Sequence, residues 1–289
     1  MGMAAGFGAF FCWGLLPLYW HPLMGIPAPE ILAHRIFWSL LTIAPFVWLT
    51  KRMPEVKAAL RSGRVMARIL CSALLVGFNW GIYVWGVTNG RVVECSLGYF
   101  INPLVNVLLG SLLLRERHTR LQWLAVGLAG AGVLWNVLAF GQFPWLALAL
   151  ALSFALYGFC RKTVKVESVP GLFLEALILF PLAGGWLLWL AVQGQGHFCA
   201  ATPGVQALLL GAGLATSAPL ALFAYAARHM HLSTLGLLQY VSPTGTFLLG
   251  VFVFQEPVTF TSLVTFGCIW TALGVYTWSS LRQQRGKAG

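Results

Sequence analysis

A few charged side chains lie inside long apolar stretches, and they are the residues most able to do chemistry. Arg35 and Glu175 each lie five residues into such a stretch, 140 positions apart. An ionised group in hydrocarbon is costly, so one that is retained usually pairs with another charge or has a function. We predict that Arg35, Glu94 and Glu175 act as gates or coupling groups, one cluster near each face. Arg35 is expected to meet Glu94, and Glu175 to meet Arg228 or Arg161; purely structural ion pairs are the alternative.

Two polar stripes share a helical spacing of i, i+3 and i+7 and lie 140 residues apart: Tyr99, Asn102 and Asn106, then Gln239, Ser242 and Thr246. Residues with this spacing share one face of a helix. Pro103 and Pro243 lie within the stripes, and a proline frees a backbone carbonyl one turn earlier and kinks the helix. The stripes predict the walls of a central cavity. Hydrogen bonding that only joins helices is the alternative.

Five further residues add aromatic rings and an amide at similar depth: Asn79, Trp80, Tyr83, Tyr157 and Tyr240. Aromatic rings with a few hydrogen-bonding groups suit an aromatic or amphipathic small molecule better than an inorganic ion. Packing and anchoring at the membrane interface are the alternative for each ring. We predict that these residues and the two stripes bind a small-molecule substrate.

Motifs for catalysis and cofactor binding are missing from the sequence. It contains no Asp, no GxxxxGK[ST], no HExxH and no CxxC. These are the short patterns that bind nucleotide phosphates, zinc or a redox pair. We therefore expect no enzyme, no cofactor and no metal site.

The elements that must position these residues are membrane-spanning helices. The chain of 289 residues is 59% hydrophobic and only 9% charged, which is too apolar for a soluble protein of this size. Stretches long enough to cross a bilayer lie near residues 4–20, 30–49, 66–88, 93–114, 120–138, 143–160, 170–192, 204–226, 232–254 and 259–280. The sequence predicts an all-α polytopic membrane protein with ten transmembrane helices.

The basic residues indicate how these helices are oriented. The net charge is +11, and 16 of the 18 Lys and Arg fall in alternate loops and the C-terminal segment, Arg35 and Arg91 excepted. This asymmetry is the positive-inside pattern and places both termini in the cytoplasm, so we expect no nucleic-acid partner. The loop at residues 51–65 reads as a basic amphipathic segment that rests on the lipid headgroups.

An internal repeat divides the chain. Residues 97–127 align with residues 237–267 and share Pro103/Pro243, Gly110/Gly250, Glu116/Glu256 and Gly127/Gly267. Each copy holds five predicted helices, and an odd number inverts the second copy in the membrane. Inverted repeats are common in secondary transporters, which bind substrate near the midplane where the copies meet. Glu116 and Glu256 are expected to be turn or cap residues.

The predicted organisation is a first repeat at residues 1–138, a second at residues 143–280 and a short basic tail at residues 281–289. This pattern resembles the EamA unit of the drug/metabolite transporter superfamily. The segments PEILAHRIFWS (29–39), ECSLGYFINPLVN (94–106), SFALYGFCRK (153–162), LFLEALILFP (172–181) and LSTLGLLQYVSPT (232–244) are similar to RarD-type members.

The resemblance implies two inverted five-helix EamA repeats in a bacterial inner membrane, with both termini cytoplasmic. RarD-type proteins carry a chloramphenicol-sensitivity label, and related proteins export amino acids and other metabolites. We expect a secondary transporter that exports a small organic metabolite or drug-like molecule by alternating access. It would lie in the lipid bilayer, with a homodimer as one option for its assembly. A lipid or lipid-linked sugar flippase and a passive membrane component are the alternatives.

Overall fold

The computed structural model describes residues 1–89, 91–255 and 258–288, and this part of the chain contains helices and no strand. The elements are α1 (Gly2–Trp20), the short 3-10 helix η1 (His21–Leu23), α2 (Ala28–Leu49), α3 (Met53–Arg61), α4 (Gly63–Thr88), α5 (Val92–Leu113), α6 (Arg120–Phe140), α7 (Trp145–Thr163), α8 (Ser168–Val192), α9 (Pro203–His229), α10 (Leu232–Leu238), α11 (Val241–Phe252) and α12 (Phe260–Ala288).

Ten segments of the described chain are long and apolar enough to cross a membrane, and their ends lie within three residues of the predicted ones. α3 is the predicted amphipathic segment: it buries Val56 and Ala59 and exposes Lys57. α12 continues to Ala288, so most of the predicted tail is an extension of the last helix.

The helices pack in the mirrored scheme that an inverted duplication predicts. Equivalent helices of the two halves pair directly, as α2 with α8, α5 with α10, and α6 with α12. α7 packs on α4 and α5, and its counterpart α1 packs on α9 and α11. Arg115 and Gln255, again 140 residues apart, both have a left-handed backbone, with φ of 54° and 57°. The predicted fold of two inverted five-helix repeats is confirmed.

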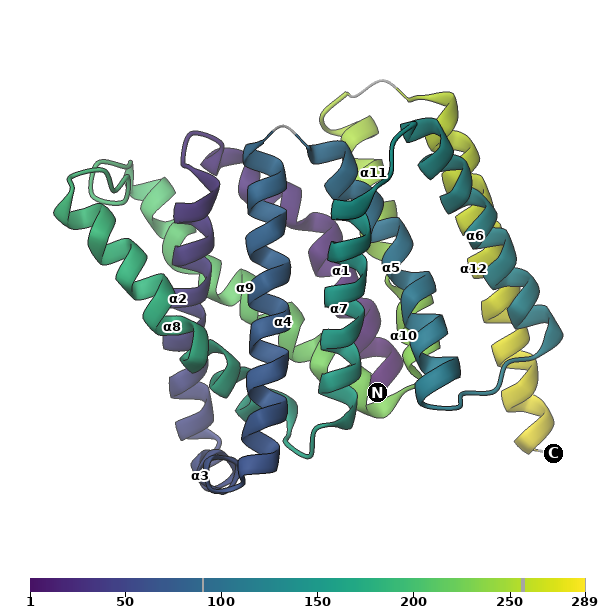
Figure 1. The fold of residues 1–289 in the computed structure, drawn as a ribbon, viewed down its shortest axis with the longest axis horizontal. Coiled ribbons are helices and arrows are strands. Elements are labelled where there is room, and N and C mark those ends of the chain that lie inside the picture. The colour runs from purple at the N-terminus through teal and green to yellow at the C-terminus, as the bar shows by residue number, and fades with distance from the viewer. Residues whose placement is uncertain (90, 256–257, 289) are drawn as a thin grey trace.

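Both chain ends lie on one side of the bundle, together with α3 (Figure 1). We call this side the terminal face and the other the opposite face. In the same view α6 and α12 lie side by side at one end of the molecule, and α2 and α8 lie towards the other end.

The ninth span is broken one turn before its proline. α10 ends at Leu238 and α11 begins at Val241. Pro243 has no N–H for the carbonyl of Gln239, which instead accepts a hydrogen bond from the Ser242 N–H at 3.0 Å. Pro103 lies within α5, which runs on without interruption. The two stripes therefore differ in backbone, although both contain a proline.

The repeated glycine and glutamate have a structural role in the first half. The Glu116 carboxylate accepts hydrogen bonds from the backbone N–H groups of Leu232 and Ser233, at 2.7 and 3.0 Å, and from the Ser233 hydroxyl at 2.6 Å. A Cβ on Gly110 would lie 2.5 Å from this carboxylate, so a glycine is needed there. Glu116 is thus a cap, as predicted, but of α10 in the other half. Glu256 lies outside the described residues.

Burial and hydrogen bonding act in opposite directions on Glu116, which lies between two spans. Burial alone raises its pKa, but the hydrogen bonds from Ser233 and Leu232, with the nearby His231, outweigh it and hold the pKa below its ordinary value. Thr119 begins α6 with a capping box that includes Gln122. The terminal face therefore joins the halves through a charged cap.

Replacing Gly213 with Ala is expected to destabilise the protein by about 2 kcal/mol, because α2 and α9 cross there with their backbones in contact. A Cβ on Gly213 would overlap the Trp38 backbone, and Ser39 Oγ donates to the Gly213 carbonyl at 3.2 Å. Unfolding in mixed detergent micelles measures the loss. Gly204, on the same helix, has open space beside it, so Gly204→Ala is the matched control. Equal stability of the two variants would contradict this packing.

Candidate functional site

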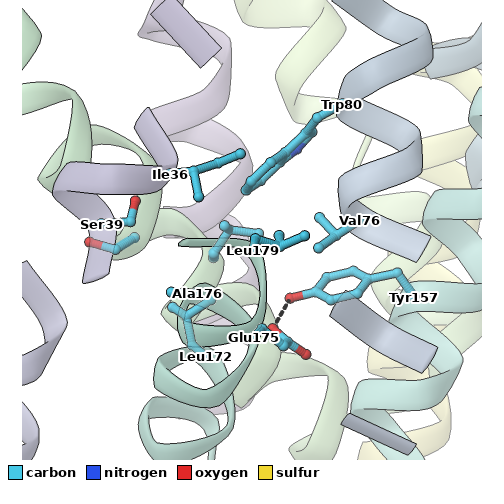
Figure 2. Close-up of a pocket in the computed structure, with 11 residues that line it drawn as sticks. Ile36, Ser39, Val76, Trp80, Tyr157, Leu172, Glu175, Ala176 and Leu179 are labelled. Atoms are coloured by element: carbon cyan, nitrogen blue, oxygen red, sulfur yellow. Dashed lines mark hydrogen bonds between the residues drawn. The ribbon is translucent and has the colours of Figure 1, made fainter. Parts of the chain in front are cut away.

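A small cavity lies between α2, α4, α7, α8 and α9. It is lined by Ile36, Ser39, Val76, Trp80, Tyr157, Leu172, Glu175, Ala176, Leu179, Ser217 and Leu220. Figure 2 shows Trp80 at one end and Tyr157 with Glu175 at the other, with Val76 and Leu179 between them. Its volume is about 20 Å³, which is room for about one water molecule.

The cavity lies where the two halves meet. Three pairs of its lining residues are related by the 140-residue offset of the repeat: Ile36 and Ala176, Ser39 and Leu179, and Trp80 and Leu220. Arg35 and Glu175, the mirrored charges, flank it from α2 and α8. The cavity therefore straddles the pseudo-twofold axis that relates the repeats.

A closed polar network surrounds Glu175 at one end of the cavity. Its Oε1 accepts hydrogen bonds from Ser72 Oγ at 2.5 Å and Arg161 Nη1 at 3.3 Å, and its Oε2 accepts one from the Tyr157 hydroxyl at 3.2 Å. The side chains of Glu175 and Arg161 are 2% and 0% exposed. The predicted ion pair of Glu175 with Arg161 is confirmed, whereas Arg228 pairs with Glu167 at 3.0 Å.

A glycine makes room for the buried arginine. Gly171 lies in the first turn of α8, and a Cβ there would overlap the guanidinium of Arg161. Arg161 Nη2 donates to the Ser168 carbonyl at 2.9 Å, which ties the end of α7 to the start of α8. The network therefore closes the terminal-face end of the cavity.

Arg35 lies in an aromatic cluster on the other side of the cavity. Its guanidinium carbon is 5.1 Å from the ring centre of Trp20 and 5.3 Å from that of Trp80, and its Nε donates to Thr216 Oγ1 at 3.0 Å. Tyr83 and Tyr99, with ring centres 6.1 Å apart, interact with it electrostatically. Because Trp80 also lines the cavity, this cluster continues into it.

The predicted pairing of Arg35 with Glu94 is wrong. Glu94 is 1% exposed and forms a 2.5 Å ion pair with Arg91, one turn earlier on the chain. It also accepts a hydrogen bond from the Leu146 N–H at 2.9 Å, at the first turn of α7. A carboxylate is stabilised at a helix N-terminus, where backbone donors are unpaired. Glu94 therefore has a structural role in this arrangement.

The residues of the polar stripes mostly bond neighbouring helices. Asn102 Nδ2 donates to the Ala151 carbonyl at 2.6 Å, and Asn106 Nδ2 donates to Asn102 Oδ1 at 2.9 Å and Gln239 Oε1 at 3.3 Å. Neither stripe lines the cavity of the described chain, and Thr246 is exposed. The structure thus has the helix-joining contacts that were the alternative, because these amides lie on the contact of α5 with α7 and α10. Substrate binding by the stripes stays a prediction.

The other predicted binding residues divide between the cavity and the helix contacts. Trp80 and Tyr157 line the cavity. Asn79 Nδ2 donates to the Leu150 carbonyl and to Ser153 Oγ, both at 2.9 Å, and the Tyr240 hydroxyl donates to the Phe100 carbonyl at 3.0 Å. Ser242 lies where α11 meets Gly14 of α1.

Three residues of this region were not predicted from the sequence, namely Trp20, Ser39 and Ser72. Ser39 follows Arg35 by one helical turn, and Ser72 precedes Asn79 by two, so both share a face with a residue that was singled out. This spacing could have identified Ser39 and Ser72 from the sequence. No such spacing relates Trp20 to Arg35, because Trp20 belongs to another helix.

Comparison with known proteins agrees with this architecture. The sequence profile of the EamA-like transporter family matches residues 1–138. The chain is 43% identical to "Protein RarD" of Streptomyces exfoliatus over 98% of this chain and 90% of that protein. It is 42% identical to "Uncharacterized transporter YojE" of Bacillus subtilis, over 96% and 93% of the two chains.

A third relative is the "Chloramphenicol-sensitive protein RarD" of Pseudomonas aeruginosa, 32% identical over 94% of this chain and 92% of its own length. One solved crystal structure superposes with a TM-score of 0.71 over 96% of this chain and 97% of its own, at 17% identity, which supports the fold. The names of the relatives indicate transport and not catalysis. This multi-pass membrane protein is a transporter that belongs to the EamA-like family, among its RarD-type members.

Proposed function

We propose that this protein is a secondary transporter that exports a small organic molecule across the bacterial inner membrane by alternating access, with both termini in the cytoplasm. The observation that carries the proposal is the cavity on the axis between the inverted halves, flanked by Arg35 and Glu175. Inverted repeats exchange conformations to open a central site to either side in turn. The positive-inside pattern supports a cytoplasmic terminal face.

The cavity is closed in this arrangement. Small-molecule sites occupy about 300–1,000 Å³, whereas this one has about 20 Å³. Binding therefore requires the helices of the two halves to separate along the contacts of α2 with α8 and α9 and of α4 with α8. These contacts lie between mirrored elements, so one movement opens one face and its mirror image opens the other.

Glu175 is the group best placed to couple opening to a proton. Its carboxylate holds Arg161, Ser72 and Tyr157 together, and these residues come from α7 and α4 while Glu175 belongs to α8. Protonation removes the negative charge that binds the guanidinium, and α8 is then released from α7 and α4. Protonation of Glu175 would thus allow the terminal-face end of the cavity to open.

Glu175→Gln is expected to insert and fold but to lose at least about 90% of transport, which is about 1.4 kcal/mol in barrier, because the amide cannot titrate. Transport is measured as uptake into proteoliposomes, with and without a pH gradient, for a panel of amino acids, amphipathic drugs and nucleotide sugars. Glu167→Gln, at an exposed surface pair, is the control. Full activity of Glu175→Gln would remove this residue from the mechanism, and flux of lipid-linked substrates alone would favour the flippase.

A further inference from the structure

The outer fork of the Arg35 guanidinium has no protein partner. Among the described residues, its one hydrogen bond runs from Nε to Thr216 Oγ1, and nothing accepts a bond from Nη1 or Nη2. Trp20 and Trp80 lie against the guanidinium at 5.1 and 5.3 Å, so the side chain is held between two rings and is partly buried. A positioned fork with two free N–H edges is therefore present beside the cavity.

Three other arginines in or next to the spans each have a carboxylate partner. Arg161 pairs with Glu175 at 3.3 Å, Arg91 with Glu94 at 2.5 Å, and Arg228 with Glu167 at 3.0 Å. Within the described part of the chain, Arg35 has no carboxylate. An unpaired cation away from water is costly, and the planar fork of arginine matches a carboxylate with two parallel hydrogen bonds.

The residues around Arg35 also indicate what the rest of a bound molecule would be, beyond the group that meets the guanidinium. Trp80 stacks on Arg35 and at the same time lines the cavity, where Ile36, Val76 and Leu179 present apolar surface. Figure 2 shows Trp80 standing over this apolar part of the cavity. A molecule whose carboxylate meets Arg35 would thus direct its body along Trp80 and into the cavity when the halves separate. An aromatic or branched aliphatic body fits this lining.

The nearby carboxylates disfavour an additional ammonium group. Glu94 is bound to Arg91 and the Leu146 N–H, and Glu175 to its own network. Glu30 accepts from the backbone and ring nitrogens of His197, each at 2.7 Å. A ligand ammonium would have to displace one of these partners, so the site fits a net anion better than a zwitterion.

We propose that Arg35, with Trp20, Trp80 and Thr216, binds the carboxylate of an amphipathic organic anion and that such anions are the substrate class. This inference rests on the proposed transport function and narrows it. The guanidinium fork recognises the charge, and the apolar lining beyond Trp80 receives the body.

Equilibrium binding to the purified full-length protein tests the proposal with four probes of one skeleton: 3-phenylpropanoate, 3-phenylpropanamide, 3-phenylpropylamine and phenylalanine. The carboxylate is expected to bind about 10–100-fold more tightly than the amide, since a hydrogen-bonded charge pair contributes about 1.5–3 kcal/mol. The amine and the zwitterion are expected to bind more weakly still. Equal affinity for carboxylate and amide, or no carboxylate binding up to about 10 mM, would overturn the proposal.

Two variants test the arginine itself. Arg35→Gln is expected to abolish the preference for the carboxylate, and Arg35→Lys to weaken carboxylate binding about tenfold, because lysine keeps the charge but not the fork. Arg282→Gln is the control. The guanidinium carbon of Arg282 also lies over a tryptophan ring, 5.7 Å from the ring centre of Trp278, but on α12, none of whose described residues lines the cavity. Should Arg35→Gln fail to fold, Arg35→Lys still decides: unchanged carboxylate affinity in it contradicts the role of the fork.

Uptake into proteoliposomes, corrected for flux into protein-free liposomes, tests the substrate class and the transport function separately. Saturable flux of the amide or amine that ignores the carboxylate would overturn the substrate class and leave the transport function standing. No saturable flux of any compound, in this series or in the broader panel, would count against the transport function even where the carboxylate binds.

Discussion

Replacing Arg161 with Met is expected to lower the free energy of unfolding by about 3–5 kcal/mol. The substitution leaves the Glu175 carboxylate buried, 2% exposed, without its cation. It also frees the Ser168 carbonyl, which Arg161 Nη2 binds at 2.9 Å. Met fills the volume of the aliphatic stem, so the loss reports mainly the guanidinium, with its charge and its hydrogen bonds. Unfolding in mixed detergent micelles measures it.

The double variant Arg161→Met/Glu175→Leu separates stability from function. Removing both charges of a buried pair is often neutral or stabilising, so the double variant is expected to fall within about 1 kcal/mol of the parent. Transport is expected to stay lost, because neither group remains to bind or release a proton. Recovery of transport with stability would show that the pair serves the fold alone. A double variant as unstable as Arg161→Met would contradict the pairing itself.

Glu116→Ala is expected to cost about 3 kcal/mol, the second largest effect. It leaves the Leu232 and Ser233 N–H groups at the start of α10 without their acceptor, and removes the 2.6 Å bond from the Ser233 hydroxyl. Glu116→Gln keeps one acceptor oxygen and should lose less. The exposed Glu55→Ala is the control, as its 3.4 Å pair with Arg52 lies on the surface. Thermal unfolding in detergent orders the variants.

The same cap predicts how stability depends on pH. The folded-state pKa of Glu116 is below its ordinary value of 4.5, because hydrogen bonds from Ser233 and Leu232 outweigh burial. The cap therefore stabilises the fold fully above about pH 4.5 and is lost as the pH falls through the lower folded value. The rings of His118 and His231 also lie beside this cap, and burial lowers the pKa of His118. A parent and Glu116→Gln with the same acid profile would contradict this assignment.

The helices and their inversion were predictable from the sequence because both follow from local properties. The length and polarity of each apolar run determine a span, and five spans per copy determine the inversion. The capping box at Thr119 is likewise local, whereas Pro103 and Pro243 give the same local signal and only the second span is interrupted. The buried pair of Arg161 with Glu175 was one of two options, since each charge lies near the same face.

The tertiary structure alone decided which polar residues meet. Tyr99, Asn102 and Asn106 share a helix face, yet Tyr99 joins the Arg35 cluster and the two amides join helices, because different neighbours cover successive turns of α5. Trp20 and Ser72 reach their partners from other helices, and Glu116 caps a helix 116 residues further along the chain. Periodicity specifies which face a residue occupies. The crossing of helices specifies what that face meets, and this depends on side chains far apart in the sequence.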